Sequence, residues 1–178
     1  MTVVVYRPEH FAGVKALWEA CFPDDPPRNR AEAAVPAKLA QDDGLLFVAE
    51  GSEGEVQGTA MAGYDGHRGW LYAVAVDPHL RHRGIGRALI EHACAELARR
   101  GCGKVNLQVR DGNEAAAAYY EGLGFVREPR ISLGRLPEQG PEQRLEADRG
   151  LVPGDLDRTL DRRVVEFRHR LSTYAARR

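Results

Sequence analysis

The sequence lacks several features that would place it outside the ordinary globular class. It has only three cysteines in 178 residues, Cys21, Cys94 and Cys102, an odd number in neither C-x-x-C nor zinc-ribbon spacing. We therefore expect reduced thiols in a cytoplasmic protein rather than a disulfide framework. No run approaches about 18 apolar residues, and no basic segment followed by an apolar stretch follows Met1. Neither a membrane span nor a signal peptide is predicted.

Excess charge of one sign is also missing. The chain carries 25 basic and 26 acidic residues, which gives a formal net charge of −1, and nothing in this balance favours nucleic acid as a partner. The hydrophobic fraction of 43% and the charged fraction of 29% are typical of a globular protein. A chain of this length fits one domain with appendages, because two full domains would each have a marginal core.

The character of the sequence changes after Pro137, where charge, proline and glycine become frequent. We therefore expect one domain over residues 1–136 and a charged linker over residues 137–178. Apolar residues recur at helical spacing in this second part, which predicts an amphipathic C-terminal helix. They are Leu156, Leu160, Val164, Phe167, Leu171 and Tyr174. Such a helix could dock on the domain or on another subunit, so a homodimer is one expectation.

Alternation and helical spacing predict a mixed order of elements. Strands are expected near residues 3–6, 45–50, 56–64, 70–76, 105–109, 125–127 and 131–136. Helices are expected over residues 11–22, 31–40, 85–99 and 114–120, the last with Asn113 as its N-cap. The glycine-bounded turn at residues 65–69 joins two long strands in a hairpin. The chain is therefore predicted to be an α/β protein.

A glycine-bearing loop lies between an apolar strand and the strongest helix. The strand ends in Val74-Ala75-Val76, and the loop reads Arg81-His82-Arg83-Gly84-Ile85-Gly86-Arg87. Backbone N–H groups at a helix start lack partners and the helix dipole is positive there, so the backbone alone can bind a phosphate or pyrophosphate. A dinucleotide fold would require a glycine in place of Leu89, and a P-loop would require Gly-Lys-Ser or Gly-Lys-Thr. Taken alone, Gly-x-Gly at a helix start is equally typical of a plain turn.

Two segments together resemble the GNAT superfamily of acetyltransferases. The family motif Arg/Gln-x-x-Gly-x-Gly/Ala after an apolar strand is matched by Arg81, Gly84 and Gly86. The family often has an Asn, a Tyr seven residues later and then Gly-Phe, as Asn113, Tyr120 and residues 124–125 do here. Residues 63–69, 100–102 and 132–136 are similar to a small bacterial branch, the YpeA-like acetyltransferases. The resemblance implies a mixed, mostly antiparallel central sheet flanked by helices, with a C-terminal extension.

The resemblance also implies the co-substrate and its binding residues. Acetyl-CoA is the expected acyl donor. Its pantetheine is expected along the backbone of Val74, Ala75 and Val76, and its pyrophosphate at His82, Arg83, Gly84, Ile85, Gly86 and Arg87. Asn113 contacts the cofactor arm in such enzymes, a role compatible with capping a helix.

The chemistry needs an unprotonated amine and a proton for the departing thiolate. Tyr120, at the family's tyrosine position, is the candidate acid. Helical spacing favours core packing for its neighbour Tyr119. The base is not identified, because Gln108 stands where the similar alanine acetyltransferases have a glutamate, and an amide does not accept a proton usefully. Bulk solvent or a water chain could serve instead.

Asp65, His67 and Tyr72 are alternative bases beside the central hairpin. His79 and His82 are three residues apart without a carboxylate or cysteine partner, so no metal is expected. Three functions remain open. The first is acetyl transfer to a primary amine on a small molecule, a peptide N-terminus or a lysine. The second is a CoA-binding module without turnover, suggested by Gln108, and the third is a scaffold centred on the C-terminal helix.

Overall fold

The computed structural model of the protein describes residues 1–136, and the chain divides into two compact units, Met1–Arg127 and Glu128–Arg178. All the helices and strands of the described residues belong to the first unit. The described part of the second unit, residues 128–136, forms neither helix nor strand. The amphipathic helix expected over residues 156–174 lies outside the described residues.

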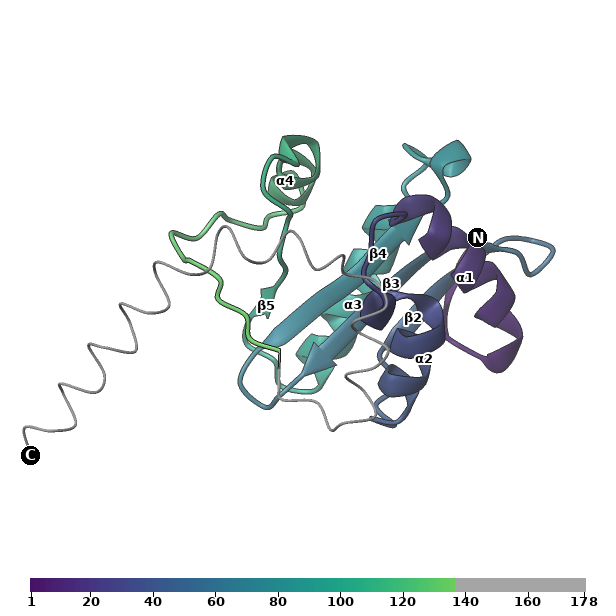
Figure 1. The fold of residues 1–178 in the computed structure, drawn as a ribbon, viewed down its shortest axis with the longest axis horizontal. Helices are drawn as coiled ribbons and strands as arrows, with labels where there is room; N and C mark the ends of the chain where they lie inside the picture. The colour runs from purple at the N-terminus through teal and green to yellow at the C-terminus, as the bar shows by residue number, and fades with distance from the viewer. Residues whose placement is uncertain (137–178) are drawn as a thin grey trace, which may run out of the picture. The chain divides into compact units, whose positions relative to one another are not determined.

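The first unit is built on a five-stranded sheet in the order β1-β2-β3-β4-β5 (Figure 1). The strands are β1 (Thr2–Val5), β2 (Leu46–Glu50), β3 (Val56–Tyr64), β4 (Gly69–Val76) and β5 (Val105–Asn106). The first four strands pair antiparallel, and only β4 and β5 are parallel. The expected mixed, mostly antiparallel sheet is confirmed, as is the hairpin of β3 and β4.

Four helices accompany the sheet, together with three-residue 3-10 helices at Pro8–His10, Pro27–Asn29 and Pro78–Leu80. The four are α1 (Phe11–Cys21), α2 (Ala31–Leu39), α3 (Ile85–Arg99) and α4 (Glu114–Glu121). The spacing that predicted α3 is the spacing of its buried side chains, since Ile85, Leu89, Ala93 and Leu97 all face the core. α2 forms despite Pro36 within it.

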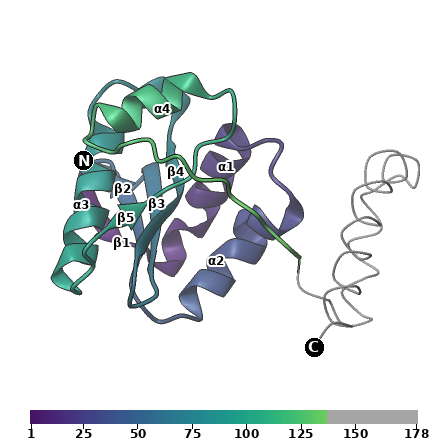
Figure 2. The same ribbon diagram turned by 90° about the vertical axis from the view of Figure 1, so that its left-hand side faces the viewer.

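The sheet lies between α3 on one face and the pair α1 and α2 on the other, as the turned view shows (Figure 2). Successive residues of β2 supply the two cores in turn. Phe47 and Ala49 pack with α3, whereas Leu46 and Val48 pack with α1 and α2. Because it is buried on both faces, β2 is apolar at each of these positions and shows no alternation.

Three expected strand segments differ from the structure. The strand expected over residues 105–109 is limited to Val105–Asn106, and residues 125–127 and 131–136 form no strand. A period-two pattern records side-chain burial, whereas a strand also needs a neighbouring backbone to pair with. Phe125 illustrates the difference, since its ring packs against the α3-side core while its backbone pairs with no strand of the described part.

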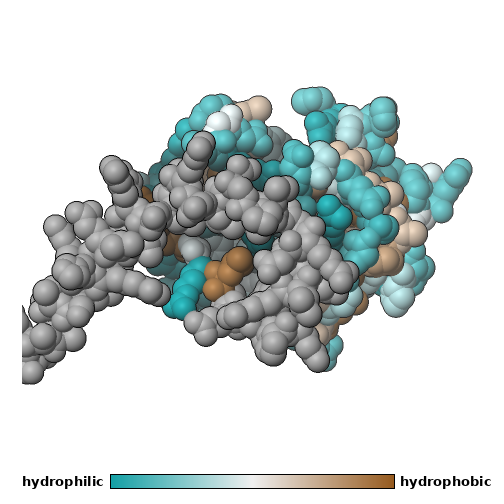
Figure 3. Space-filling view, viewed as in Figure 1, coloured by the Kyte–Doolittle hydropathy of each residue, from teal (hydrophilic) through white to brown (hydrophobic). Residues whose placement is uncertain are grey.

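On the face drawn in Figure 3, the coloured residues are mainly hydrophilic, and hydrophobic residues are visible in small groups among them. Within residues 1–136, no helix is long and apolar enough to cross a membrane.

Candidate functional site

The sheet opens between β4 and β5. The two strands pair only at Gly69 with Val105 and at Trp70 with Asn106. From Leu71 to Val76, β4 has no strand partner on that side among the described residues. Backbone N–H and C=O groups along this edge are therefore available to an extended ligand, which can bind as an added strand. The expected pantetheine-binding residues, 74–76, lie on this open edge.

A β-bulge reshapes β4 just before these residues. Thr59 of β3 pairs with Ala75, but Met61 pairs with Tyr72, so Ala73 and Val74 together stand opposite one residue of β3. Ala73 has φ +44°, which is uncommon for a residue with a Cβ and carries a conformational cost. The bulge changes the direction of the peptide groups at the start of the open edge.

The glycine-bearing loop leads into α3 in the conformation that the anion-site hypothesis requires. Gly84 is the N-cap with φ +82° and ψ −2°, and His82 also has a positive φ of +62°. No side chain caps the helix, so its first N–H groups remain available, and the first helical hydrogen bond runs from Ala88 N to Gly84 O. Arg83 and Arg87 flank this end with exposed cationic side chains. The arrangement favours an anion at the start of α3.

Three elements meet at Gly86. A Cβ added there would lie 2.7 Å from the hydroxyl oxygen of Tyr119 on α4 and 3.5 Å from Cγ2 of Val76 at the end of β4. The structure thus brings together the end of the open strand, the first turn of α3 and one face of α4. The residues expected to bind the donor lie in or beside these segments: residues 74–76 end β4, residues 82–87 lead into and begin α3, and Asn113 is the N-cap of α4.

Asn113 is the N-cap of α4, as expected. Its Oδ1 accepts a hydrogen bond from Ala116 N at 3.2 Å. This bond satisfies one of the unpaired N–H groups of the first turn and fixes where α4 begins. The amide nitrogen of Asn113 is not used by this bond, so capping leaves a donor for a ligand.

The two tyrosines of α4 differ in burial, and for Tyr119 the burial is the opposite of what helical spacing predicted. Tyr119, expected in the core, is 43% exposed and directs its hydroxyl to Gly86. Tyr120 is the more enclosed, because it packs against the α3-side core and edge-to-face on Phe125 with ring centroids 5.7 Å apart. Burial, with a smaller effect of Tyr119, raises the pKa of Tyr120 to about 12. The prediction for Tyr119 was wrong because α4 is short and Tyr120 occupies its inward face.

The alternative bases are placed differently from one another. Asp65 and His67 lie in the turn before β4, at the opposite end of that strand from Val76, a separation of about 20 Å at the rise of a strand. The Asp65 carboxylate accepts hydrogen bonds from Arg68 N and His67 N, both at 2.7 Å, which lower its pKa and make it a weaker base.

Tyr72 lies on β4 itself, beside the bulge. Its ring stacks with that of Trp70 at a centroid distance of 6.4 Å, and its side chain is half exposed. Burial of the remaining part raises the pKa of its phenol. Gln108 is exposed in the segment after β5. Of the alternatives, Tyr72 is the one close to the open edge of β4.

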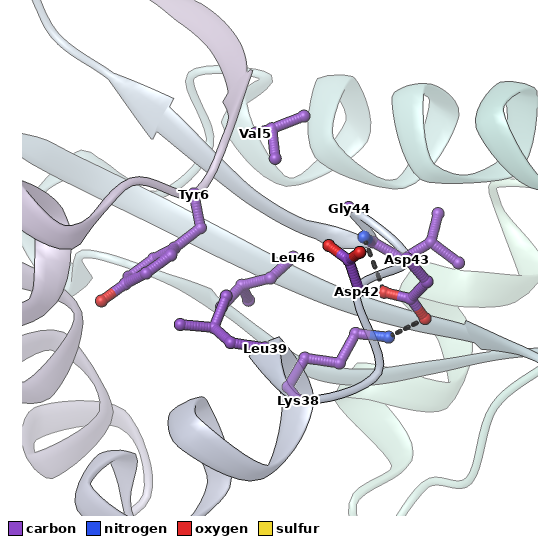
Figure 4. Close-up of a pocket in the computed structure, with 9 residues that line it drawn as sticks. Val5, Tyr6, Lys38, Leu39, Asp42, Asp43, Gly44 and Leu46 are labelled. Atoms are coloured by element: carbon purple, nitrogen blue, oxygen red, sulfur yellow. Dashed lines mark hydrogen bonds and ion pairs between the residues drawn. The ribbon is translucent and has the colours of Figure 1, made fainter.

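A separate cavity of about 200 Å³ lies between β1, β2 and the end of α2 (Figure 4). Two of its three charged side chains pair with each other, since Asp43 accepts a hydrogen bond from Lys38 Nζ at 2.6 Å, and Asp43 also accepts one from Leu45 N at 3.0 Å. None of the expected site residues lines it. Within residues 1–136 there is also no group of three or more His, Cys, Asp or Glu side chains that could hold a metal ion.

Comparisons with known proteins agree with this fold. The model of a family described as the acetyltransferase (GNAT) family matches residues 11–125. An acetyltransferase of Pectobacterium atrosepticum is 41% identical over 135 residues, which are 76% of this chain and 94% of that protein. A solved structure described as an acetyltransferase from Agrobacterium tumefaciens is similar with a TM-score of 0.63 and 27% identity, covering 76% of this chain and all of that one.

A further solved structure contains CoA. The NatC complex bound to Gag peptide and CoA is similar with a TM-score of 0.60 and 27% identity, covering 74% of this chain and 89% of that chain.

Proposed function

Because this chain belongs to the GNAT family of acetyltransferases and uses acetyl-CoA, we propose that it acetylates a primary amine by direct attack of that amine on the thioester. The observation that carries the proposal is the meeting of the open β4 edge with the uncapped start of α3. One surface satisfies the amide groups of an extended chain, and the other satisfies a pyrophosphate. CoA carries both groups in one molecule, with its pantetheine arm joined to its pyrophosphate.

Donor binding is proposed to depend mainly on the backbone. Val74, Ala75 and Val76 offer N–H and C=O groups to the pantetheine, and residues 82–87 offer N–H groups to the pyrophosphate. Arg83 and Arg87 add positive charge, although Arg87 also pairs with Glu91 at 3.1 Å. Asn113 reaches the pantetheine arm through the amide nitrogen that capping leaves unused.

The acetyl group transfers in one addition and one elimination. The nitrogen lone pair of the amine forms the new C–N bond, the thioester carbonyl becomes an oxyanion, and the C–S bond then breaks to return the carbonyl. The amine loses one proton and the thiolate of CoA gains one. No acyl-enzyme forms, so none of the three cysteines is required.

Tyr120 is proposed to assist the departing sulfur. A phenol with pKa about 12 stays protonated at neutral pH, so its hydrogen is always available as a donor. Because an ordinary thiol has a pKa of about 8.5, complete transfer of the phenolic proton of Tyr120 to a thiolate is unfavourable in free energy. We therefore assign Tyr120 a hydrogen bond to the developing thiolate, with the final proton supplied through solvent.

The proton of the amine is proposed to leave to solvent. Gln108 is exposed and cannot take it, whereas its amide can hold a water or the acceptor. A consequence is that the rate follows the fraction of acceptor that is unprotonated, and rises with pH toward the pKa of the acceptor.

Measurement of CoA release separates acetyl transfer from binding alone. Acetyl-CoA is supplied with a panel of amines that includes peptides with free N-termini, lysine peptides and amino sugars, and free thiol is followed together with acetylated product. We expect stoichiometric thiol and product with at least one member of the panel. Tight acetyl-CoA binding without turnover on any amine would favour the CoA-binding module suggested by Gln108.

A further inference from the structure

A buried hydroxyl lies directly beneath the bulge of β4. Thr59, in the middle of β3, is fully buried. Its Oγ1 accepts a hydrogen bond from the indole Nε1 of Trp18 at 2.8 Å and donates one to the carbonyl oxygen of Ala73 at 3.1 Å. An indole N–H can only donate and a carbonyl can only accept, so the two partners fix the direction of the hydroxyl proton. The two hydrogen bonds therefore form a continuous series from α1 to β4, in which every donor and acceptor has a partner and each bond is donated toward β4.

The carbonyl of Ala73 needs such a partner because the bulge interrupts the ladder there. Ala73 holds φ +44°, a conformation that persists only when its surroundings enforce it. The hydrogen bond from Thr59 stabilises that conformation of Ala73, whereas regular pairing of β4 would turn the Ala73 carbonyl away from Thr59. The next three residues along the chain, 74–76, are those assigned to the pantetheine.

Helix α1 contacts both ends of this short stretch. Trp18 reaches Ala73 through Thr59, and one turn later the thiol of Cys21 lies 3.5 Å from the carbonyl oxygen of Val76. Trp18 itself is 3% exposed and packs in the core between α1, α2 and the sheet. Helix α1 thus supports, from one face of the sheet, the strand β4 whose edge beyond Trp70 is open.

We propose that Thr59, oriented by Trp18, is a positioning residue that holds the bulge of β4 in the shape that binds acetyl-CoA. The inference rests on the proposed function, since it takes residues 74–76 as the pantetheine site. Thr59 touches no substrate and acts through the peptide groups of Ala73 and Val74. This positioning role predicts that the hydroxyl of Thr59, rather than the volume of its side chain, sets the affinity for acetyl-CoA.

Two substitutions separate the hydroxyl from the volume. Thr59→Val keeps the shape and removes both hydrogen bonds, which leaves Trp18 Nε1 and Ala73 O buried without partners. We expect acetyl-CoA to bind about tenfold more weakly. Thr59→Ser keeps the hydroxyl and loses a methyl group, and its affinity should stay within about threefold of the unaltered protein. Isothermal titration measures the affinity of each variant for acetyl-CoA, and a thermal melt measures its stability.

A matched control removes the contribution of stability. Val14 is also fully buried, on α1 and in the same core, but its apolar side chain takes no part in the hydrogen bonds of Thr59. Val14→Ala should lower the melting temperature as a core cavity does and leave the affinity for acetyl-CoA within about twofold. An affinity loss in Thr59→Val no larger than that in Val14→Ala would overturn the proposal.

Trp18→Phe carries the same test should Thr59→Val not fold. It frees the hydroxyl proton from its fixed direction, and we expect acetyl-CoA to bind about threefold more weakly. A folded Trp18→Phe variant with unchanged affinity would overturn the role of the relay. Absence of acetyl-CoA binding by the unaltered protein would instead overturn the proposed function, so the two failures are distinct.

Discussion

Substitution of Gly84 by alanine tests whether the loop before α3 requires a left-handed residue. Gly84 has φ +82°, and an added Cβ would meet no atom within 4 Å. The cost of the substitution is therefore conformational rather than steric, about 1–2 kcal/mol for an L-residue in this region. If the loop keeps its shape in the variant, the free energy of unfolding of the protein falls by that amount. The melting temperature then falls by about 4 °C for each kcal/mol.

The same cost appears in binding if the loop relaxes in the free protein. The left-handed conformation must then be restored when acetyl-CoA binds, and 1–2 kcal/mol corresponds to a loss of about 5- to 30-fold in affinity. The two losses are linked, so we expect their sum, expressed as free energy, to match the backbone cost. Isothermal titration with acetyl-CoA and differential scanning calorimetry measure the two parts. Gly84→Asn should lose less, because asparagine tolerates this region better.

Gly86→Ala is the matched control two residues away. Gly86 lies in the first turn of α3, where alanine improves helix propensity by about 1 kcal/mol. Its added Cβ would crowd only the hydroxyl end of Tyr119, a side chain that can swing aside. The melting temperature should not fall, and the affinity should stay within about threefold. Equal losses in Gly84→Ala and Gly86→Ala, or no loss in Gly84→Ala, would refute the reasoning.

Three further predictions concern Tyr120 and the bulge. Tyr120→Phe should slow acetyl transfer at least about tenfold while the affinity for acetyl-CoA changes by less than about twofold, and unchanged turnover would remove Tyr120 from its role. Its folded pKa of about 12 lies above the ordinary value of 10.0, so this group stabilises the fold fully below about pH 10 and the contribution is lost as pH rises through about 12. Urea titrations between these pH values should show a steeper decline for the unaltered protein than for Tyr120→Phe, and parallel declines would contradict the assignment. Ala73→Val should lower the unfolding free energy by about 1–2 kcal/mol, whereas Ala73→Gly should leave it within about 0.5 kcal/mol, and equal effects in urea melts would argue against strain at this residue.

Local patterns predicted most elements because the forces that form them act over a few residues. The helix over Ile85–Arg99 and the strand over Val56–Tyr64 have the bounds that periodicity indicated. Asn113 caps α4 as its position suggested, through a bond to the third residue of the same helix. Such features need only neighbours in sequence, and a single sequence contains them.

Strand pairing, and the choice of which side chain faces the core, depend on residues that are far apart in the sequence. The strand expected to follow Val105 ends at Asn106, because β4 and β5 diverge and no other backbone of the described residues pairs with the segment. Tyr119 and Tyr120 are adjacent, and helical spacing favoured the core for Tyr119, whereas in the structure its hydroxyl lies beside Gly86. The core that receives Tyr120 is formed by α3 and the sheet, far from α4 in sequence.

The glycine-bearing loop, the helix that follows it and the resemblance that indicated acetyl-CoA could all be recognised in the sequence. The tertiary structure added the point at which β5 leaves the edge of β4, the bulge at Ala73 and the hydroxyl of Thr59 beneath it. The physical reason is that a bulge and an open edge are relations between strands. They depend on where β3, α1 and β5 place their backbone and side-chain partners, which no local run of residues specifies.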